Sequence, residues 1–168
     1  MAAEARAGTG VLLATTTKDS VAQVRALISA ALPVRYADGF YTALVDGSRA
    51  SLEARLTAEG PLVGHAAWMM QEINGAKDVY LLDLVVDARY RRSGIGSGLV
   101  GEAIKDGRCK GAGRIILHVQ TTNEDALAFY AKLGFRIIDT ITNYYSVRVV
   151  PPDAHLVALS ICHDSGTT

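Results

Sequence analysis

The stretch Tyr90–Gly101 reads YRRSGIGSGLVG and places two arginines ahead of four glycines where a helix is expected to begin. A glycine in a helix interior costs about 1 kcal/mol relative to alanine, so this concentration of glycine indicates a ligand that needs bare backbone. Free N–H groups at a helix N-terminus, with the positive end of the helix dipole, form an anion site. The pattern Arg91-x-x-Gly94-x-Gly96 therefore predicts a loop that binds a diphosphate.

Other interpretations of the glycines fit less well. A Walker-type loop needs Lys and then Ser or Thr after its last glycine, and the chain has neither at that place. Gly96–Gly101 matches the letters of the dinucleotide fingerprint, but its first glycine falls about ten residues after the preceding strand instead of at the tight turn. A purely structural alternative is a glycine-rich turn in which Gly98 and Gly101 allow close packing of the helix.

Hydrophobic periodicity on both sides of this segment predicts alternating helices and strands. Helices are expected at 21–32 (with Asp19 or Ser20 as its cap), at 38–46, from the arginine-glycine segment to about 110, and at about 123–133. Strands are expected at 11–15, 50–57, 62–72, 78–86, 114–120, 135–141 and 155–161, with a hairpin turn at Asn74–Gly75. This order predicts an α/β domain over residues 11–162, with one mixed, mostly antiparallel sheet of about seven strands and about four helices. The ends, 1–10 and 163–168, are small and polar, and we expect them to be flexible.

The composition excludes several classes of protein. The chain has 168 residues and equal numbers of basic and acidic side chains, 17 of each, so we expect no direct nucleic-acid binding. No apolar run approaches the roughly 18 residues of a membrane span, and the N-terminus lacks a signal-peptide core. Cys109 and Cys162 have no metal-ligand spacing and are expected to be reduced thiols. These features indicate a protein of the cytoplasm or nucleus that binds neither membrane nor metal.

Two separated motifs resemble those of the GNAT acetyltransferases. Arg91-x-x-Gly94-x-Gly96 is similar to the acetyl-CoA loop of that family, Arg/Gln-x-x-Gly-x-Gly/Ala. Asn123–Phe135, NEDALAFYAKLGF, is similar to the family's Asn-x-x-Ala-x-x-Phe-Tyr-x-x-x-Gly-Phe helix. The stretches LPVRYADGFY (32–41), NYY (143–145) and PDAH (152–155) narrow the resemblance to N-alpha-acetyltransferases of the NatE type, over about residues 28 to 158.

This resemblance implies the GNAT fold and transfer of acetyl from acetyl-CoA to the α-amine of protein N-termini, with initiator Met followed by an apolar residue preferred. It implies no metal, and as partners the N-termini of nascent or mature proteins and a ribosome-associated N-terminal acetyltransferase complex. It assigns acetyl-CoA to the following residues: Leu84, Val85, Val86, Arg91, Arg92, Ser93, Gly94, Ile95, Gly96, Ser97, Asn123 and Tyr130. Within this set the Tyr130 hydroxyl would reach the departing sulfur.

The base is expected at Tyr80 and His118. Tyr80 alternates with Leu82 and Leu84 and so shares their face of a strand, while His118 lies inside an otherwise apolar strand. Each of the two, taken alone, is typical of core packing. The resemblance implies instead that they hold a water that removes the amine proton. A relay of this kind suits tyrosine, whose ordinary pKa near 10 makes it a poor base by itself.

Peptide contacts are also implied by the resemblance. They fall on Leu32, Pro33, Val34, Tyr36, Leu82, Tyr144 and Tyr145. The family usually has phenylalanine where this chain has Leu32, so the pocket for the first residue is expected to differ in size. Two alternatives stay open: a GNAT enzyme that acetylates lysine or a small amine, and an acyl-CoA-binding subunit without catalysis.

Overall fold

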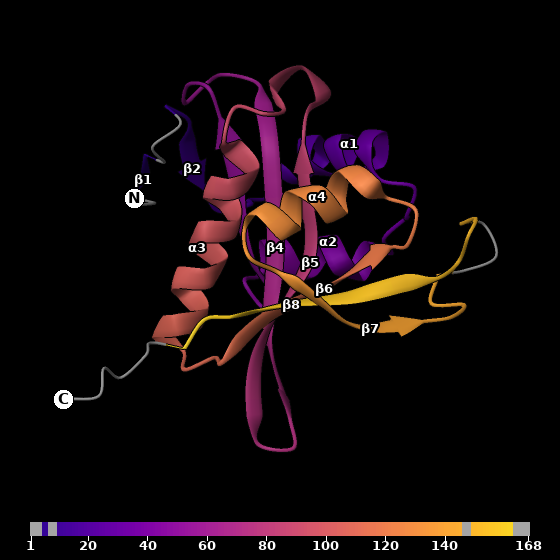
Figure 1. Cartoon of the computed structure of the whole chain (residues 1–168). Helices are drawn as coiled ribbons and strands as arrows, with labels where there is room; N and C mark the ends of the chain where they lie inside the picture. The colour runs from indigo at the N-terminus through magenta and orange to yellow at the C-terminus, as the bar shows by residue number, and fades with distance from the viewer. Residues whose placement is uncertain (1–4, 7–9, 146–148, 163–168) are drawn as a thin grey trace. The chain divides into compact units, whose positions relative to one another are not determined.

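The computed structural model describes residues 5–6, 10–145 and 149–162 (Figure 1). Its contacts divide the chain into two compact units, which are described separately. Unit 1 comprises Met1–Met69 and Leu81–Ala103, and unit 2 comprises Met70–Tyr80 and Ile104–Thr168, in each case over the described residues. Three elements, β4 (Leu62–Ile73), β5 (Ala76–Val86) and α3 (Ile95–Cys109), contribute residues to both units.

Unit 1 contains the N-terminal strands of the sheet. The hydrogen-bonded order is β1, β2, β3, β4, β5, and the first three pairs in this order are antiparallel. The new strands are β1 (Ala5–Arg6), β2 (Leu12–Ala14) and β3 (Ala50–Arg55). The strand β1 falls within the segment 1–10 that we expected to be flexible. Residues 1–4 and 7–9 of that segment lie outside the described residues.

The core of unit 1 lies between its two N-terminal helices and the sheet. These helices are α1 (Val21–Ala31) and α2 (Asp38–Val45). Val24 and Ile28 of α1, four residues apart and so on one face of the helix, are buried with Phe40 of α2 against Ala67 and Val85 of the sheet. The predicted capping of α1 is wrong in one respect: Ser20 is the N-cap residue, yet its side chain makes no capping bond and donates to Glu53 instead.

The predicted hairpin turn is confirmed at the junction of β4 and β5. Asn74 and Gly75 have φ values of 53° and 79°, the left-handed conformation that a two-residue hairpin turn requires and that these residue types adopt readily. Figure 1 shows the resulting β4–β5 hairpin as a long two-stranded ribbon. Along β5, buried residues alternate with half-buried ones from Val79 to Val86, as expected for a strand with one tightly packed face.

Unit 2 contains the C-terminal strands. Its order is β4, β5, β6, β8, β7, in which β5 and β6 are parallel and the pairs β6–β8 and β8–β7 are antiparallel. Its further elements are β6 (Arg114–Gln120), α4 (Glu124–Lys132), β7 (Arg136–Ile141) and β8 (Ala154–Ser160). Gly134, with φ of 92°, ends α4 in the left-handed conformation. The predicted α/β class and mixed sheet are confirmed, with β1 as an additional short strand.

No helix in the described part of the chain is long and apolar enough to cross a membrane. The expected flexible end at 163–168 lies outside the described residues.

Candidate active site

Unit 2 brings Tyr80 and His118 together. They lie on the paired strands β5 and β6, where Tyr80 is the register partner of Ile116, two residues before His118. The Tyr80 hydroxyl lies 2.7 Å from Nδ1 of His118, which is a normal hydrogen-bond length. The two sequence candidates for the base therefore form one hydrogen-bonded pair.

Tyr144 completes this cluster. Its hydroxyl lies 3.0 Å from that of Tyr80, and its ring stacks on the imidazole of His118 with centroids 4.0 Å apart and an interplanar angle of 14°. Tyr145 meets the Tyr144 ring edge-on at 5.0 Å, and its backbone N–H donates to the carbonyl of Pro152 at 2.8 Å. Tyr144, predicted to contact the peptide, thus lies against the predicted base, and Tyr145 packs behind it.

Burial controls the protonation of this cluster. Partial burial lowers the pKa of His118 below its ordinary value of 6.5, because a charged imidazolium loses hydration. Burial is the main cause that raises the pKa of Tyr145 above 10.0, and the nearby Tyr144 raises it further. His118 is therefore neutral near pH 7 and able to accept a proton, while Tyr145 keeps its proton.

The predicted diphosphate loop belongs to unit 1 and leads into α3. Arg92 and Gly94 have positive φ values of 61° and 85°, and the side chains of residues 91–93 are exposed. The first hydrogen bond of α3 runs from the Gly98 N–H to the Gly94 carbonyl at 2.9 Å. By helix geometry, the N–H groups of Ile95, Gly96 and Ser97 then point out of the helix end and can meet an anion.

The arginines around this loop differ in their partners. Arg89 donates to both carboxylate oxygens of Asp87, at 3.1 and 2.8 Å, and these bonds lower the pKa of Asp87 to about 2. Within the described part of the chain, Arg91 makes one side-chain hydrogen bond, from its Nε to the Val86 carbonyl at 3.1 Å. The guanidinium of Arg91 is therefore better placed than that of Arg89 to give its remaining donors to phosphate oxygens.

The other predicted acetyl-CoA residues lie on β5 and on α4. Leu84 and Val86 are half-buried and Val85 is 2% exposed, all in unit 1. In unit 2, Asn123 is the N-cap of α4, and its Oδ1 accepts from the Ala126 N–H at 3.1 Å. Tyr130 is 6% exposed and lies edge-on between the rings of Phe129 and Phe135. Its ring is thus part of the core.

The predicted peptide residues of unit 1 gather at the end of α1. Leu32 is the C-cap of that helix, and Leu32, Tyr36 and Leu82 pack against the core of unit 1. The Tyr36 hydroxyl donates to the Leu82 carbonyl at 2.7 Å, and its ring stacks on Phe40 with centroids 4.1 Å apart. Val34 is half-buried and Pro33 is exposed. The structure thus brings Tyr36 and Leu82 into direct contact.

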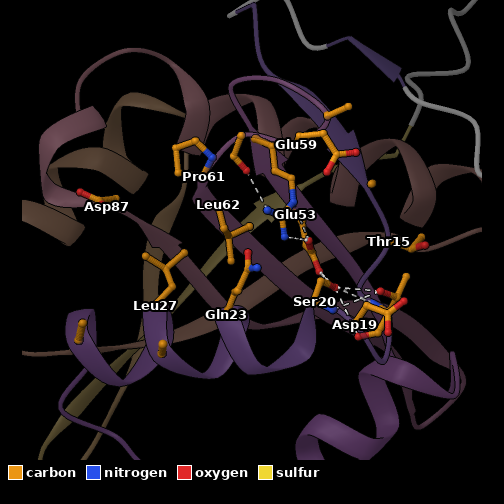
Figure 2. Close-up of a pocket in the computed structure, with 17 residues that line it drawn as sticks. Thr15, Asp19, Ser20, Gln23, Leu27, Glu53, Glu59, Pro61, Leu62 and Asp87 are labelled. Carbon is orange, nitrogen blue, oxygen red and sulfur yellow. Dashed lines mark hydrogen bonds and ion pairs between the residues drawn. The ribbon is translucent and has the colours of Figure 1, made fainter.

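A cavity of about 830 Å³ in unit 1 is lined by none of the predicted site residues, although Asp87, the partner of Arg89, is part of its lining (Figure 2). Figure 2 shows Glu53, which is 2% exposed, joined by dashed lines to neighbouring groups. Its carboxylate accepts from the Ser20 hydroxyl and from Arg55, whose Nη2 lies 3.0 Å away. Because these bonds satisfy the carboxylate within the protein, we assign the cavity no ligand.

Sequence reasoning missed a buried polar group beside the predicted residues of β5. His65 of β4 and Asp83 of β5 are both fully buried, with His65 Nδ1 2.8 Å from Asp83 Oδ1. Thr16 Oγ1 lies 3.3 Å from His65 Nε2. The predicted hairpin could have indicated this contact, because His65 and Asp83 lie nearly the same number of residues before and after the Asn74–Gly75 turn and so come close together on its two strands.

No cluster of three or more His, Cys, Asp or Glu side chains in residues 5–6, 10–145 and 149–162 is placed to hold a metal ion.

Comparisons with known proteins find similarity over most of the chain. Residues 21–135 match the model of the acetyltransferase (GNAT) family. The chain is 33% identical over 153 residues to N-alpha-acetyltransferase 50 of Danio rerio, covering 89% of the chain and 88% of that protein. It is 34% identical to the probable N-acetyltransferase san of Drosophila melanogaster, covering 86% and 78%. Among solved structures it resembles Arabidopsis thaliana Naa50 in complex with the bisubstrate analogue CoA-Ac-MVNAL, with a TM-score of 0.78, 35% identity and coverage of 90% and 99%.

Proposed function

Because this chain belongs to the GNAT family of acetyltransferases, we propose that it transfers the acetyl group of acetyl-CoA to the α-amine of protein N-termini. The observation that carries this proposal is the 2.7 Å hydrogen bond between Tyr80 and His118, which joins the two groups expected to act as the base. The similarity to zebrafish N-alpha-acetyltransferase 50 over most of both chains supports the same activity. So does the similarity to the plant Naa50, whose bound ligand links CoA to an acetylated peptide.

Acetyl-CoA supplies the acetyl group, and the residues present suit its diphosphate and its pantetheine arm. In unit 1, the backbone from Arg91 to Ser97 offers N–H groups at the start of α3, and the positive φ of Gly94 suits close approach by the phosphates. Leu84, Val85 and Val86 offer strand backbone to the amides of the pantetheine. In unit 2, Asn123 and the Tyr130 hydroxyl are the proposed contacts near the sulfur.

The chemical step needs only one proton to leave the incoming amine. An α-amine has an ordinary pKa near 8, so a substantial fraction is neutral at pH 7 to 8. As the nitrogen forms its bond to the acetyl carbon, the carbon–sulfur bond breaks and CoA leaves as the thiolate. The one proton that the nitrogen loses passes to a water held by Tyr80 and His118. Since burial lowers the pKa of His118, its imidazole is neutral in this pH range and can receive that proton through the Tyr80 hydroxyl.

The proposed preference for an initiator methionine followed by an apolar residue follows from the uncharged side chains proposed to contact the peptide. In unit 1, Leu32, Val34, Tyr36 and Leu82 are half-buried and apolar or aromatic, and together with Pro33 they are the proposed contacts of the first side chain. In unit 2, Tyr144 and Tyr145 are the proposed partners of the peptide backbone. An initiator methionine followed by an apolar residue suits such surroundings, because neither side chain brings a charge that would have to be desolvated.

We also propose that the enzyme works in the cytoplasm, on N-termini of nascent or mature proteins, within a ribosome-associated N-terminal acetyltransferase complex. Cys109 and Cys162 are both exposed free thiols, which suits a reducing compartment.

A panel of peptides tests the activity. Peptides that begin Met-Leu, Met-Val, Ser or Glu, each with one internal lysine, are incubated with acetyl-CoA, and mass spectrometry identifies the acetylated atom. Met-Leu is expected to be acetylated fastest, at the α-amine. Acetylation of the lysine alone would favour the lysine enzyme, and equal rates for all four would remove the proposed preference.

A matched variant tests the position of the diphosphate. Gly94→Glu places a carboxylate at the proposed anion site, so acetyl-CoA affinity measured by calorimetry is expected to fall at least tenfold. Gly101→Ala, inside α3 where an added Cβ would meet nothing within 4 Å, is the control and should retain affinity. Unchanged binding by Gly94→Glu would contradict the placement, and CoA binding by the wild type without any turnover would identify a binding subunit.

A further inference from the structure

Tyr144 makes two different contacts with the proposed base. Its hydroxyl lies 3.0 Å from the Tyr80 hydroxyl, which in turn lies 2.7 Å from Nδ1 of His118. Its ring lies flat on the imidazole at a centroid distance of 4.0 Å. Tyr144 is itself 41% exposed, so it forms the solvent-facing side of the cluster. One residue thus touches both partners of the pair through different parts of its side chain.

The proposed proton transfer, together with the number of protons available, fixes the direction of these hydrogen bonds. A phenol has one proton to donate, whereas its oxygen can accept from more than one donor. For His118 to gain a proton through Tyr80, Nδ1 must offer its lone pair, and Tyr80 must donate to it. The Tyr80 proton is then used, so the Tyr144 hydroxyl can bond to Tyr80 only by donating to the Tyr80 oxygen.

We propose that Tyr144 is a positioning residue for the base, in addition to any contact with the peptide. Its hydroxyl holds the Tyr80 proton directed at His118 Nδ1, and its ring shields the imidazole from water. This inference rests on the proposed acetyl transfer, since it describes how the base of that reaction is kept ready. The opposite order, with Nδ1 of His118 donating to Tyr80 and Tyr80 donating to Tyr144, would place the imidazole lone pair on Nε2, so Tyr80 could not pass the amine proton to His118.

The surroundings of His118 agree with shielding by neutral groups. The Tyr80 phenol faces it from β5, the Tyr144 phenol faces it from the segment after β7, and Leu156 is its register partner on β8. Burial is the cause of the lowered pKa of His118. Removing the Tyr144 ring would hydrate the imidazole and should raise that pKa toward its ordinary value.

Two variants separate the two contacts. Tyr144→Phe removes the hydroxyl and keeps the stacked ring, while Tyr144→Leu removes both. The tautomer and pKa of His118 are measured by ¹⁵N NMR on the full chain, with His118→Ala to assign its signals and the melting temperature to check folding. Each variant is also measured for kcat, for the KM of the peptide and for the pH profile of kcat/KM. A useful control is His155→Gln, because His155 lies on β8, bonded to Thr140 Oγ1 at 2.8 Å.

The wild-type protein is expected to hold its His118 proton on Nε2. Tyr144→Phe should mix the two tautomers and lower kcat roughly tenfold, about the effect of losing one neutral hydrogen bond. Tyr144→Leu should also raise the His118 pKa, so that activity is lost at a higher pH as the solution is acidified. His155→Gln should change none of these quantities.

Three results would overturn the inference. One is an unchanged tautomer and kcat in Tyr144→Phe; a second is a rise in peptide KM alone, as expected of a residue that only contacts substrate. The third is a wild-type imidazole protonated on Nδ1. If the wild type transfers no acetyl group, the proposed function fails, and the tautomer measurement still decides the direction of the hydrogen bonds.

Discussion

Two histidines of this chain occupy similar local structures and differ in what they can do. His65 in unit 1 and His118 in unit 2 each lie on a strand, and each has a partner within 2.8 Å of Nδ1 on a neighbouring strand. The partner of His65 is the carboxylate of Asp83, and the partner of His118 is the phenol of Tyr80. His65 and Asp83 are fully buried, whereas His118 is only half-buried and Tyr144 beside it is exposed.

The difference indicates that access to solvent, rather than the residue type, separates these two histidines. Asp83 Oδ2 is buried and has no hydrogen-bond partner among the described residues, so the hydrogen bond to His65 stabilises this carboxylate in the core. The side chain of His65 is itself fully buried and its Nε2 lies against Thr16, so its imidazole is closed off from a substrate. His118 is only half-buried and lies beside the exposed Tyr144, which suits its proposed role as part of the base.

The largest effect should come from His118→Ala. Loss of the group that receives the proton is expected to lower kcat by about 10²- to 10⁴-fold, with the dissociation constant of acetyl-CoA nearly unchanged. Steady-state kinetics and calorimetry measure the two quantities. His155→Ala is the matched control and should keep its kcat. A large loss of CoA binding by His118→Ala would contradict its assignment as part of the base.

An intermediate effect is expected for His65→Ala, and it should lower the stability of the fold rather than the turnover. This substitution leaves the buried Asp83 carboxylate without its partner, which should lower the free energy of unfolding by about 3–5 kcal/mol and the melting temperature by roughly 10 °C. Denaturation curves and kcat of the folded fraction are the measurements. A double-mutant cycle with Asp83→Ala should show strong coupling between the two residues. Lost turnover without lost stability would make His65 a functional residue and remove the contrast with His118.

The smallest effect is expected for Thr16→Val. Valine has nearly the same shape as threonine but lacks the hydroxyl that lies 3.3 Å from His65 Nε2. Loss of this long hydrogen bond should lower the free energy of unfolding by about 1 kcal/mol and leave kcat unchanged. Thr15→Val, at an exposed neighbouring position, is a control for the loss of a threonine hydroxyl. A cost for Thr16→Val as large as that of His65→Ala would mean that the hydroxyl is essential to the buried group.

Much of the fold could be predicted because its signals are local. Alternation in β5, the Asn74–Gly75 turn and the four-residue spacing of Val24 and Ile28 depend only on neighbours along the chain. The cap of α1 shows the limit of such reasoning. Ser20 has the right residue type and position, but Glu53, distant in sequence, offers its hydroxyl a buried carboxylate. The tertiary contact therefore replaced the local one.

The candidate site likewise combines residues that the sequence indicated with contacts that it did not. The resemblance to a family supplied Tyr80 and His118, and the parallel pairing of β5 with β6 explains why the two can meet. No sequence pattern indicated that Tyr144 would stack on His118, because its position depends on the path of the chain after β7 and on the bond from the Asn143 N–H to Asp153 at 2.9 Å. The contact of His65 with Asp83 was likewise unforeseen, although both residues flank the predicted hairpin.

The amino-acid sequence by itself determined the order of helices and strands, the glycine loop at the start of α3, and which residue types are available for proton transfer, since all of these depend on spacing along the chain. Only the tertiary structure decided which imidazole would be buried against a carboxylate and which would stand beside two phenols near solvent. The physical reason is that burial and hydrogen-bond partners come from residues distant in sequence, and these surroundings set the free energy of moving a proton.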